Sequence, residues 1–284
     1  MNQATIPLLA ALGILSAGTA RAGDLPSVKT SADTFHVATL NAWGLPFPVA
    51  RGRARRLPAI ARFVERSGFD VVGLQEVWNG ARRHLSLPGL LFPNRVHGDS
   101  GLALVSSHPA SAPRVTPFQH ATGPDALKHK GVLSSQVELT RHRKLWTLVT
   151  HLQAGRGAKP ARIRQQQVGV VLDVIEHLPG PAVVVGDFNF YDTPEDRDSE
   201  LRLKSAGLVD AAAREGETSP TYVGSDHRFD RVFLRSEDGV ELKPVAANVI
   251  HYGGPLPQLS DHRPLHVELA WVDHSLQQAR NSTP

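Results

Sequence analysis

The sequence contains no cysteine, a single methionine and only 6% aromatic residues. Without cysteine the chain can form no disulfide, no thiolate metal site and no cysteine nucleophile. It also lacks a Gly-x-Ser-x-Gly motif and a phosphate-binding loop of the Gly-x-x-x-x-Gly-Lys type, which excludes two common catalytic designs. Beyond the N-terminus no apolar run is long enough to span a bilayer, which favours a soluble fold.

The N-terminal stretch is typical of a secretory signal peptide. A short apolar segment, Ile6 to Ala17, precedes Ala20-Arg21-Ala22, a pattern of small residues that suits cleavage. We therefore expect a signal peptide at 1–22, a single domain at 23–272 and a flexible tail at 273–284. This predicts a secreted or periplasmic protein. An exported chain without disulfides takes its stability from its core, and we expect a bound ion to contribute.

The most informative stretch is 182–189, an unbroken apolar run that ends in Asp187, Phe188 and Asn189. It predicts a buried strand whose C-terminal end carries polar groups. If the chain stays extended, Asp187 and Asn189 face one site while Phe188 packs away from it. The alternative is that Gly186 and Asp187 begin a turn that Asn189 caps.

Other strand-like runs also end in polar residues, and amphipathic helices separate some of them. Helical spacing predicts helices over 56–66 and 163–178 and a third over 195–206, whereas the strands over 131–139 and 144–151 share a tight polar link. Helices interleaved with hairpins predict an α/β four-layer sandwich: two packed mixed β-sheets with helices on the outer faces. The polar strand ends are Asn41, Glu76 and His151, and the motif Ser260-Asp261-His262 precedes a further strand.

These residues suit metal-assisted phosphoester hydrolysis. The oxygen donors Asn41, Glu76, Asp187, Asn189 and Asp261 are hard ligands of the kind that Mg²⁺ prefers. The imidazoles of His151 and His262 titrate near neutral pH, so they can act as base, acid or phosphate donors. A metal that neutralises phosphate charge and a group that activates water complete such a site.

The ordered motifs of the mature chain resemble the endonuclease/exonuclease/phosphatase superfamily. Within it, Asn41-Ala42-Trp43-Gly44-Leu45-Pro46, Gln75-Glu76-Val77-Trp78, Lys130-Gly131-Val132 and Thr150-His151-Leu152-Gln153-Ala154 look most like secreted neutral sphingomyelinases of the phospholipase C type. The remaining motifs of the resemblance are Gly186-Asp187-Phe188-Asn189, Phe229-Asp230-Arg231-Val232 and Ser260-Asp261-His262.

The resemblance implies a role for each matched residue. Glu76 would be the principal Mg²⁺ ligand with Asn41 and Asp261 beside it, and Mn²⁺ or Co²⁺ would be able to substitute. His262 would be the general base, oriented by Asp230. The remaining matched residues would position the nucleophile and the phosphate: Asp187, Asn189 and His151.

The motif Ser260-Asp261-His262-Arg263 has a second copy, Ser225-Asp226-His227-Arg228. The family pattern places an aspartate strand upstream of the catalytic Asp-His pair, and only the later copy has one, at Asp230. We therefore interpret His227 as a loop residue.

For the substrate, the resemblance implies a phospholipid at a membrane surface: sphingomyelin, cleaved to ceramide and phosphocholine. Exposed apolar residues round the site would fit this, and the candidates are Phe47, Pro48, Val49, Leu90, Leu91 and Phe92. A secreted deoxyribonuclease-like endonuclease or another phosphoesterase of the superfamily is the alternative, favoured by the net charge of +4 and the arginines at 51–56. A catalytically silent binding module is a third reading. No obligate protein partner is evident.

Overall fold

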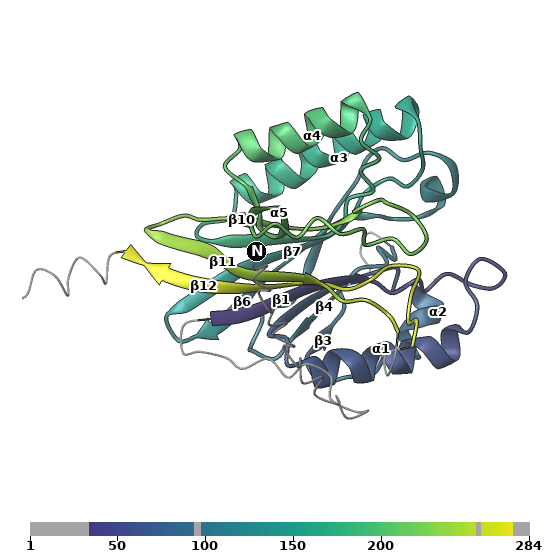
Figure 1. Cartoon of the computed structure of the whole chain (residues 1–284), viewed down its shortest axis with the longest axis horizontal. Coiled ribbons are helices and arrows are strands. Elements are labelled where there is room, and N and C mark those ends of the chain that lie inside the picture. The colour runs from purple at the N-terminus through teal and green to yellow at the C-terminus, as the bar shows by residue number, and fades with distance from the viewer. Residues whose placement is uncertain (1–33, 94–97, 254–256, 275–284) are drawn as a thin grey trace, which may run out of the picture.

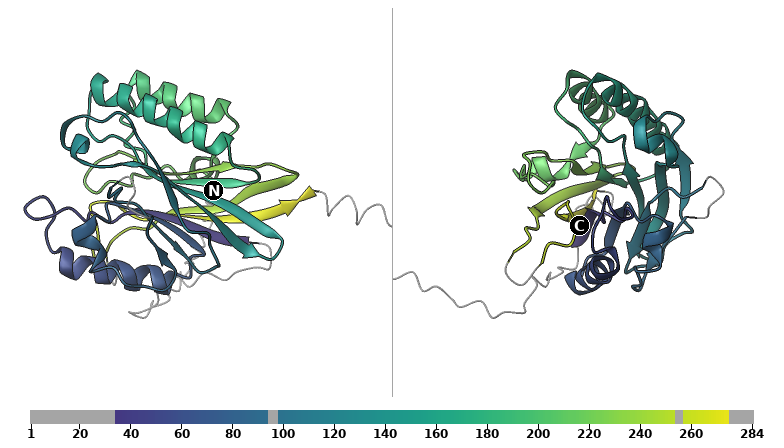
Figure 2. Two further views of the ribbon diagram at one scale, coloured as in Figure 1. Left: turned by 180° about the vertical axis from the view of Figure 1, so that it is seen from behind. Right: turned by 90° about the vertical axis from the view of Figure 1, so that its right-hand side faces the viewer.

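The strand-forming runs assemble into two six-stranded mixed sheets packed face to face, with helices on their outer faces (Figures 1 and 2). The computed structural model describes residues 34–93, 98–253 and 257–274. The predicted fold class is confirmed. In spatial order, the first sheet consists of β11 (Val240–Val249), β12 (Leu265–Asp273), β1 (Thr34–Asn41), β2 (Val71–Gln75), β4 (Ala103–Ser106) and β3 (Leu90–Leu91).

The second sheet has the same number of strands and holds the apolar run that stood out in the sequence. In spatial order its strands are β5 (Arg114–Pro117), β6 (Gly131–Thr140), β7 (Arg143–His151), β8 (Ala182–Asp187), β10 (Asp230–Arg235) and β9 (Val209–Asp210). The strand β8 is buried along its whole length, as the apolar run predicts.

The helices divide between the two outer faces of the sandwich. Figures 1 and 2 show α1 (Arg53–Ser67) and α2 (Asn79–Arg82) against the first sheet, and α3 (Ala158–Glu176) and α4 (Pro194–Ser205) against the second. Two short helical segments lie in connections: the 3₁₀ helix η1 (Gly123–Leu127) and α5 (Ala211–Arg214).

Three layers of apolar side chains hold this arrangement together. Val37 and Val185 belong to the layer between the sheets, Ile60 to the layer under α1, and Val171 to the layer under α3. The sheets approach so closely at Gly73 that a Cβ there would lie 2.3 Å from Cγ2 of Val185. A larger side chain at this position would therefore push the sheets apart.

Strand direction brings the polar strand ends together. β1 and β2 are parallel, with Asn41 opposite Gln75, and β7 and β8 are parallel, with His151 opposite Asp187. β10 runs antiparallel to β8 and places Asp230 opposite Asp187. Both sheets therefore deliver their functional groups to one end of the sandwich.

Some boundaries differ from those expected. α1 begins at Arg53 rather than Arg56, so Pro58 lies inside the helix instead of in its first turn. β12 continues through Asp273, into the stretch assigned to the tail. The expected signal peptide at 1–22 and the tail from residue 275 lie outside the described residues. Within the described part of the chain, no helix is long and apolar enough to cross a membrane.

Candidate active site

The polar strand ends line a cavity of about 420 Å³. Both sheets contribute to it, together with the loops after β7 and before β10 and the loop between β11 and β12. Its walls are formed by Asn41, Glu76, His151, Ala154, Arg156, Asp187, Asn189, Tyr191, Tyr222, Ser225, His227, Phe229, Asp261 and His262. The structure thus places every predicted site residue in this wall except Asp230, which is fully buried behind it.

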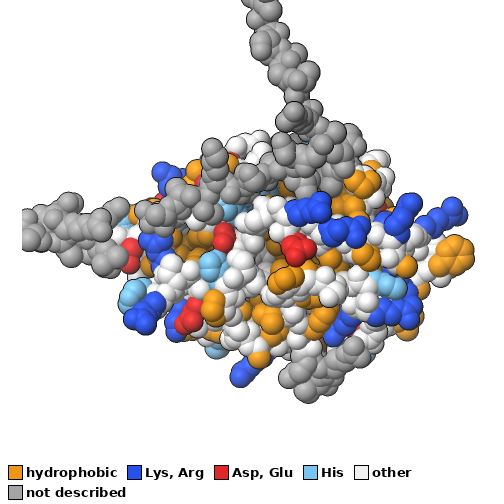
Figure 3. All heavy atoms as spheres, turned by 90° about the horizontal axis from the view of Figure 1, so that it is seen from below, with side chains coloured by type: hydrophobic (Ala, Val, Ile, Leu, Met, Phe, Trp, Pro, Cys, Tyr) orange, Lys and Arg blue, Asp and Glu red, His pale blue; other side chains and the backbone are white. Residues whose placement is uncertain are grey.

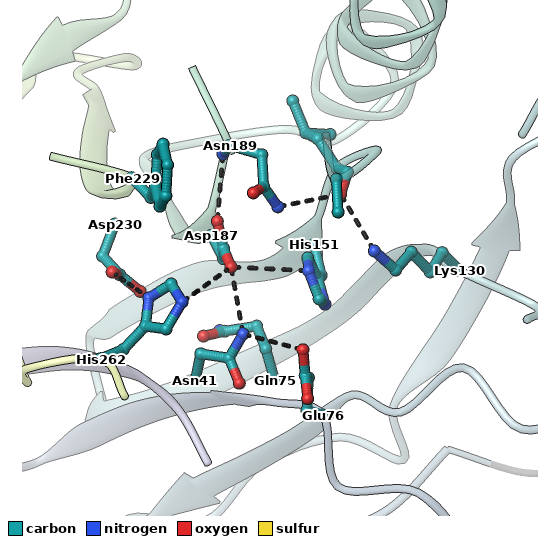
Figure 4. A network of polar contacts seen from close by, with 12 residues as sticks. Asn41, Gln75, Glu76, Lys130, His151, Asp187, Asn189, Phe229, Asp230 and His262 are labelled. Carbon is teal, nitrogen blue, oxygen red and sulfur yellow. Dashed lines mark hydrogen bonds and ion pairs between the residues drawn. The ribbon is translucent and has the colours of Figure 1, made fainter. Parts of the chain in front are cut away.

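Asp187 lies at the centre of the polar network (Figure 4). Its Oδ2 accepts a hydrogen bond from Asn41 Nδ2 at 3.1 Å and lies 3.5 Å from Nε2 of His151 and 3.6 Å from Nε2 of His262. Burial raises the pKa of Asp187 to about 6, although the nearby His262 opposes this shift. One carboxylate therefore joins side chains from both sheets.

Asn189 reaches the cavity in a different way from the extended one expected. β8 ends at Asp187, whose Oδ1 accepts a hydrogen bond from the backbone N–H of Asn189 at 3.0 Å, and Asn189 has a φ of 51°. The chain therefore turns at once, because the aspartate side chain satisfies the first free backbone donor. The expectation of an extended pair was wrong at Asn189. The turn alternative differs from the structure too, because Gly186 and Asp187 still belong to β8 and the Asp187 side chain caps the Asn189 N–H. Phe188 packs into the core, as predicted.

His262 is held by a buried carboxylate. Its Nδ1 lies 2.8 Å from Oδ2 of Asp230, at the start of β10, and its Nε2 faces Asp187 (Figure 4). Burial alone would lower the pKa of His262, but the charges of Asp230 and Asp187 reverse this effect and raise it to about 10. Asp230 therefore fixes the ring and favours its protonated form, leaving Nε2 directed at the cavity.

Glu76 has the properties of a cation ligand. It follows β2 with a φ of 57°, an uncommon backbone conformation for a residue other than glycine. Asn41 Nδ2 donates to its Oε1 at 3.3 Å, whereas Oε2 is buried with no hydrogen-bond partner in the part of the chain that the structure describes. Burial raises the pKa of Glu76 to about 7. A buried carboxylate oxygen with no protein partner is what a site for a hard cation requires.

The donor set around Glu76 fits Mg²⁺ in kind. Asp261 lines the same cavity and offers carboxylate oxygens. Asn41 lines it too, but its amide nitrogen faces Glu76 and Asp187, while its Oδ1 accepts a hydrogen bond from the Trp43 backbone N–H at 2.9 Å. In the described ranges no group of three or more His, Asp or Glu side chains is already arranged to hold a metal. A cation here would therefore rest on Glu76, the neighbouring oxygens and water, as is common for Mg²⁺.

His151 differs from His262 because it has no carboxylate of its own at hydrogen-bonding distance. Burial lowers its pKa well below the usual value, and the positive charge of Lys130 adds to this effect. Lys130 donates to Asp125 Oδ2 at 2.8 Å and to the Leu152 carbonyl at 3.1 Å (Figure 4). His151 is therefore neutral, and its Nδ1 has no hydrogen-bond partner among the described residues.

The duplicated motif ends in two histidines that line the same cavity. Only His262 contacts Asp230; Nε2 of His227 instead lies 2.8 Å from a guanidinium nitrogen of Arg156. His227 does belong to a loop, but that loop forms part of the cavity wall. The sequence did not predict that His227, Tyr191 and Phe229 line one side of the cavity. They come from loops that no local sequence pattern connects.

The loop between β1 and α1 projects at the same end of the molecule (Figure 1). Phe47 is 76% exposed and Val49 is 61% exposed. Figure 3 shows hydrophobic and basic side chains gathered at this end, and Phe47, Arg51, Arg53 and Arg83 line one shallow pocket. The other rim candidates differ, because Leu90, Leu91 and Phe92 are half-buried against the core.

Arg56 has a structural role that separates it from the rest of the arginine run. It is buried and donates hydrogen bonds to the carbonyls of Ala42, Trp43 and Leu259, while its guanidinium lies 4.6 Å from the Trp43 ring centre. It thus ties the projecting loop to the segment before His262. Arg51 and Arg55 remain exposed.

One end of the two-sheet sandwich thus brings together carboxylates and imidazoles, the groups that metal-assisted phosphoester hydrolysis requires. The chain belongs to the endonuclease/exonuclease/phosphatase family, whose family model matches residues 38–262. Members of this family are phosphoesterases and are commonly metal-dependent. The match begins in β1 and ends at His262, so it includes all the site residues described above.

A UPF0294 protein of Vibrio vulnificus (strain YJ016) is 31% identical to the chain over 101 residues, which is 36% of this chain and 31% of that protein. Among solved structures, sphingomyelinase C from Streptomyces griseocarneus gives a TM-score of 0.60 at 19% identity, over 83% of this chain and 99% of that one.

Two other solved structures show the same fold. A mutant of beta toxin from Staphylococcus aureus with bound magnesium ions gives a TM-score of 0.62 at 17% identity, over 83% of this chain and 99% of that one. TDP2 from D. rerio, complexed with a single-strand DNA product, gives a TM-score of 0.64 at 21% identity, over 83% of this chain and 98% of that one. These likenesses establish the fold and leave the substrate open.

Proposed function

We propose that the chain is a secreted or periplasmic Mg²⁺-dependent phosphodiesterase that hydrolyses sphingomyelin to ceramide and phosphocholine. The observation that carries the lipid substrate is the projecting loop, in which the consecutive residues 46–49 are all apolar and exposed. Exposed apolar side chains at the same end of the sandwich as the cavity suit a substrate whose chains stay in a bilayer.

In the proposed reaction the chain's own residues orient the phosphate and move protons. His262 takes a proton from the attacking water at Nε2, while Asp230 holds Nδ1. The new bond forms between the water oxygen and phosphorus, and the bond from phosphorus to the ceramide oxygen breaks. His151 donates a hydrogen bond to the phosphate or to the leaving oxygen, and Asn189 and Asp187 position the nucleophile and the phosphate. The leaving oxygen takes a proton from solvent to become the ceramide hydroxyl, and His262 returns its proton to solvent.

Bound Mg²⁺ would neutralise phosphate charge and polarise the phosphoryl oxygens. Glu76 would hold it, with Asn41 and Asp261 beside it. Positive charge beside Asp261 would also lower the pKa of His262, because Asp261 is one of the carboxylates that raise it. This effect favours the unprotonated ring that a base requires.

A nuclease is the second candidate. Exposed Arg51 and Arg55 on the projecting loop and at the start of α1 support it, as does the likeness to TDP2. A nuclease would gain its affinity from such basic residues and would lose it steeply with salt. The two candidates are separated by offering sphingomyelin vesicles and plasmid DNA in parallel, with Mg²⁺ and with chelator. Rapid Mg²⁺-dependent cleavage of DNA with intact vesicles would replace the lipid proposal with the nuclease one.

Replacing Phe47 tests the role of the loop directly. Phe47→Ser is expected to lower hydrolysis of sphingomyelin in vesicles on the order of 30-fold, because insertion of the ring contributes about 2 kcal/mol. Hydrolysis of a soluble phosphocholine ester, the Mg²⁺ requirement and thermal stability should stay close to the parent values, since the ring is exposed.

Leu201→Ser is the matched control, because it removes a side chain of 61% exposure from α4, on the outer face of the second sheet. Equal losses in the two variants on vesicles would show that the loop has no special contact with the membrane. A parallel loss on the soluble ester would place Phe47 in the folded core instead.

A further inference from the structure

Among the described residues that line the cavity, Arg156 is the one side chain that is always positively charged, and it has no part in the proposed reaction so far. The cavity wall includes the carboxylates of Glu76, Asp187 and Asp261, but its only arginine is Arg156, and it has no lysine. Lys130 lies behind the wall, paired with Asp125. Arg156 comes from the loop between β7 and α3, shortly after His151.

The guanidinium of Arg156 is held by a histidine rather than by an acid. One of its terminal nitrogens lies 2.8 Å from Nε2 of His227. A guanidinium can only donate, so Nε2 of His227 must be the acceptor, and its ring is unprotonated at that nitrogen. In the described part of the chain Arg156 forms no ion pair with a carboxylate. Arg156 is exposed at the cavity wall, so its charge remains available to an anion in the cavity.

Aromatic rings flank this pair. The His227 ring stacks on Phe229, with ring centres 5.0 Å apart and planes inclined by 18°, and it meets the edge of Tyr191 at 5.0 Å. The Arg156 guanidinium lies 5.6 Å from the centre of the Tyr191 ring. Phe229 is itself buried and precedes Asp230, the residue that orients His262. The wall that positions Arg156 is therefore continuous with the one that positions the base.

We infer that Arg156 is a further catalytic residue, which donates to a non-bridging oxygen of the reacting phosphate, and that His227 is its positioning residue. One N–H of Arg156 is used by His227, and the others have no acceptor among the described residues. A phosphodiester carries one negative charge, and more charge develops on its oxygens as water attacks. A guanidinium oriented by His227 would stabilise this change. The inference rests on the proposed phosphodiester hydrolysis but not on the lipid.

The test compares Arg156→Gln and Arg156→Lys with Arg162→Gln. Arg162 lies on α3, pairs loosely with Glu195 at 3.8 Å and does not line the cavity, so its loss changes net charge equally. We expect Arg156→Gln to lower kcat by roughly 10²-fold, as loss of one such donor does. Arg156→Lys should recover part of this loss, and Arg162→Gln should match the parent. The substrates are sphingomyelin vesicles and bis(4-nitrophenyl) phosphate.

The positioning role of His227 is tested by combining its substitution with that of Arg156. His227→Phe keeps the stacking on Phe229 but removes the acceptor, so it should lower kcat several-fold in the parent and have no further effect in Arg156→Gln. Independent, additive losses would overturn the positioning role, because residues acting through one another are not additive. Parent-like kcat in Arg156→Gln would overturn the inference as a whole.

Two outcomes separate this inference from the proposed function. If bis(4-nitrophenyl) phosphate is hydrolysed and sphingomyelin is not, the lipid proposal fails, and the variants still decide the role of Arg156. If neither is hydrolysed, calorimetric binding of inorganic phosphate decides it. Weaker binding in Arg156→Gln than in Arg162→Gln supports the inference, and equal binding contradicts it.

Discussion

The molecule buries two pairs of histidines, and their surroundings differ. His151 and His262 lie at the strand ends, on either side of Asp187 (Figure 4). His36 and His266 lie on neighbouring strands, β1 and β12, with His36 Nδ1 3.1 Å from His266 Nε2. The second pair is covered by Phe69, whose ring stacks on His266 at 5.0 Å. Both pairs are almost inaccessible to water.

The difference lies in the carboxylates. At the strand ends, Asp230 and Asp187 raise the pKa of His262 to about 10, although burial opposes them, while burial and Lys130 lower the pKa of His151. In the sheet, burial and the neighbouring His36 lower the pKa of His266 to about 4. The first environment shifts the pKa values of its two imidazoles in opposite directions, which is a pattern of catalytic sites. The second keeps its imidazoles neutral, which is a pattern of cores.

Of the changes to the two histidine pairs, removal of His262 should have the largest effect on activity. His262→Ala is expected to lower hydrolysis by roughly two to four decades, because the proton acceptor and the partner of Asp230 are both lost. Steady-state kinetics at saturating Mg²⁺ measure the effect.

His227→Ala provides the control within the same cavity. It should cost less than tenfold, since His227 contacts Arg156 rather than Asp230. A loss at His227 equal to or larger than that at His262 would mean that the wrong copy of the duplicated motif has been assigned to the base.

The second prediction concerns Glu76, a carboxylate of the cavity, and has a smaller expected effect. Glu76→Gln should abolish the response of activity and of melting temperature to Mg²⁺ while the protein stays folded. Ligand at about 100 times its Kd stabilises a protein by about 2.7 kcal/mol, so the parent should show a clear shift. The variant should also be at least as stable as the parent in chelator, because a buried carboxylate oxygen without a partner has been replaced by a neutral group. Parent-like Mg²⁺ titrations in the variant would place the metal elsewhere.

Much of the site could be predicted because the end of each strand is visible in the sequence as a change from apolar to polar residues. Asn41, Glu76, His151 and Asp187 follow apolar runs, and parallel pairing then makes neighbouring ends coincide. The pairing of His262 with Asp230 followed only from the family pattern, since 32 residues separate them. Arg156 and His227 are 71 residues apart on two loops, so no local period or spacing connects them.

The fold was predicted less completely at its edges. β11 was missed because Pro244 interrupts a run that otherwise resembles a strand. The structure tolerates it because β11 is an edge strand with a bulge between Pro244 and Ala246. The two-residue strands β3 and β9 carry too little pattern to be recognised. Asn189 departed from the extended geometry because its backbone donor was satisfied by a side chain, which periodicity does not describe.

The smallest expected effect concerns His266, in the histidine pair within the sheet, and the dependence of protein stability on pH. His266 has a pKa of about 4 when folded and an ordinary value of 6.5 when unfolded, so between these values the unfolded chain binds more protons. The free energy of unfolding must therefore fall as the pH drops from about 6.5 to about 4, by at most about 3 kcal/mol from this group. The carboxylates of Glu268 and Asp70 oppose the corresponding shift at His36, so His266 is the better residue to change.

His266→Gln removes the titration but keeps a group able to hydrogen-bond to His36. Urea unfolding between pH 8 and pH 4 should show a shallower loss of stability in this variant than in the parent, whatever its stability at pH 8. The difference between the two curves is the informative quantity, because carboxylates elsewhere, such as Asp187 with its pKa of about 6, titrate in both proteins. Parallel curves would show that His266 is not held neutral. The two histidine pairs would then not differ in the way that their carboxylates imply.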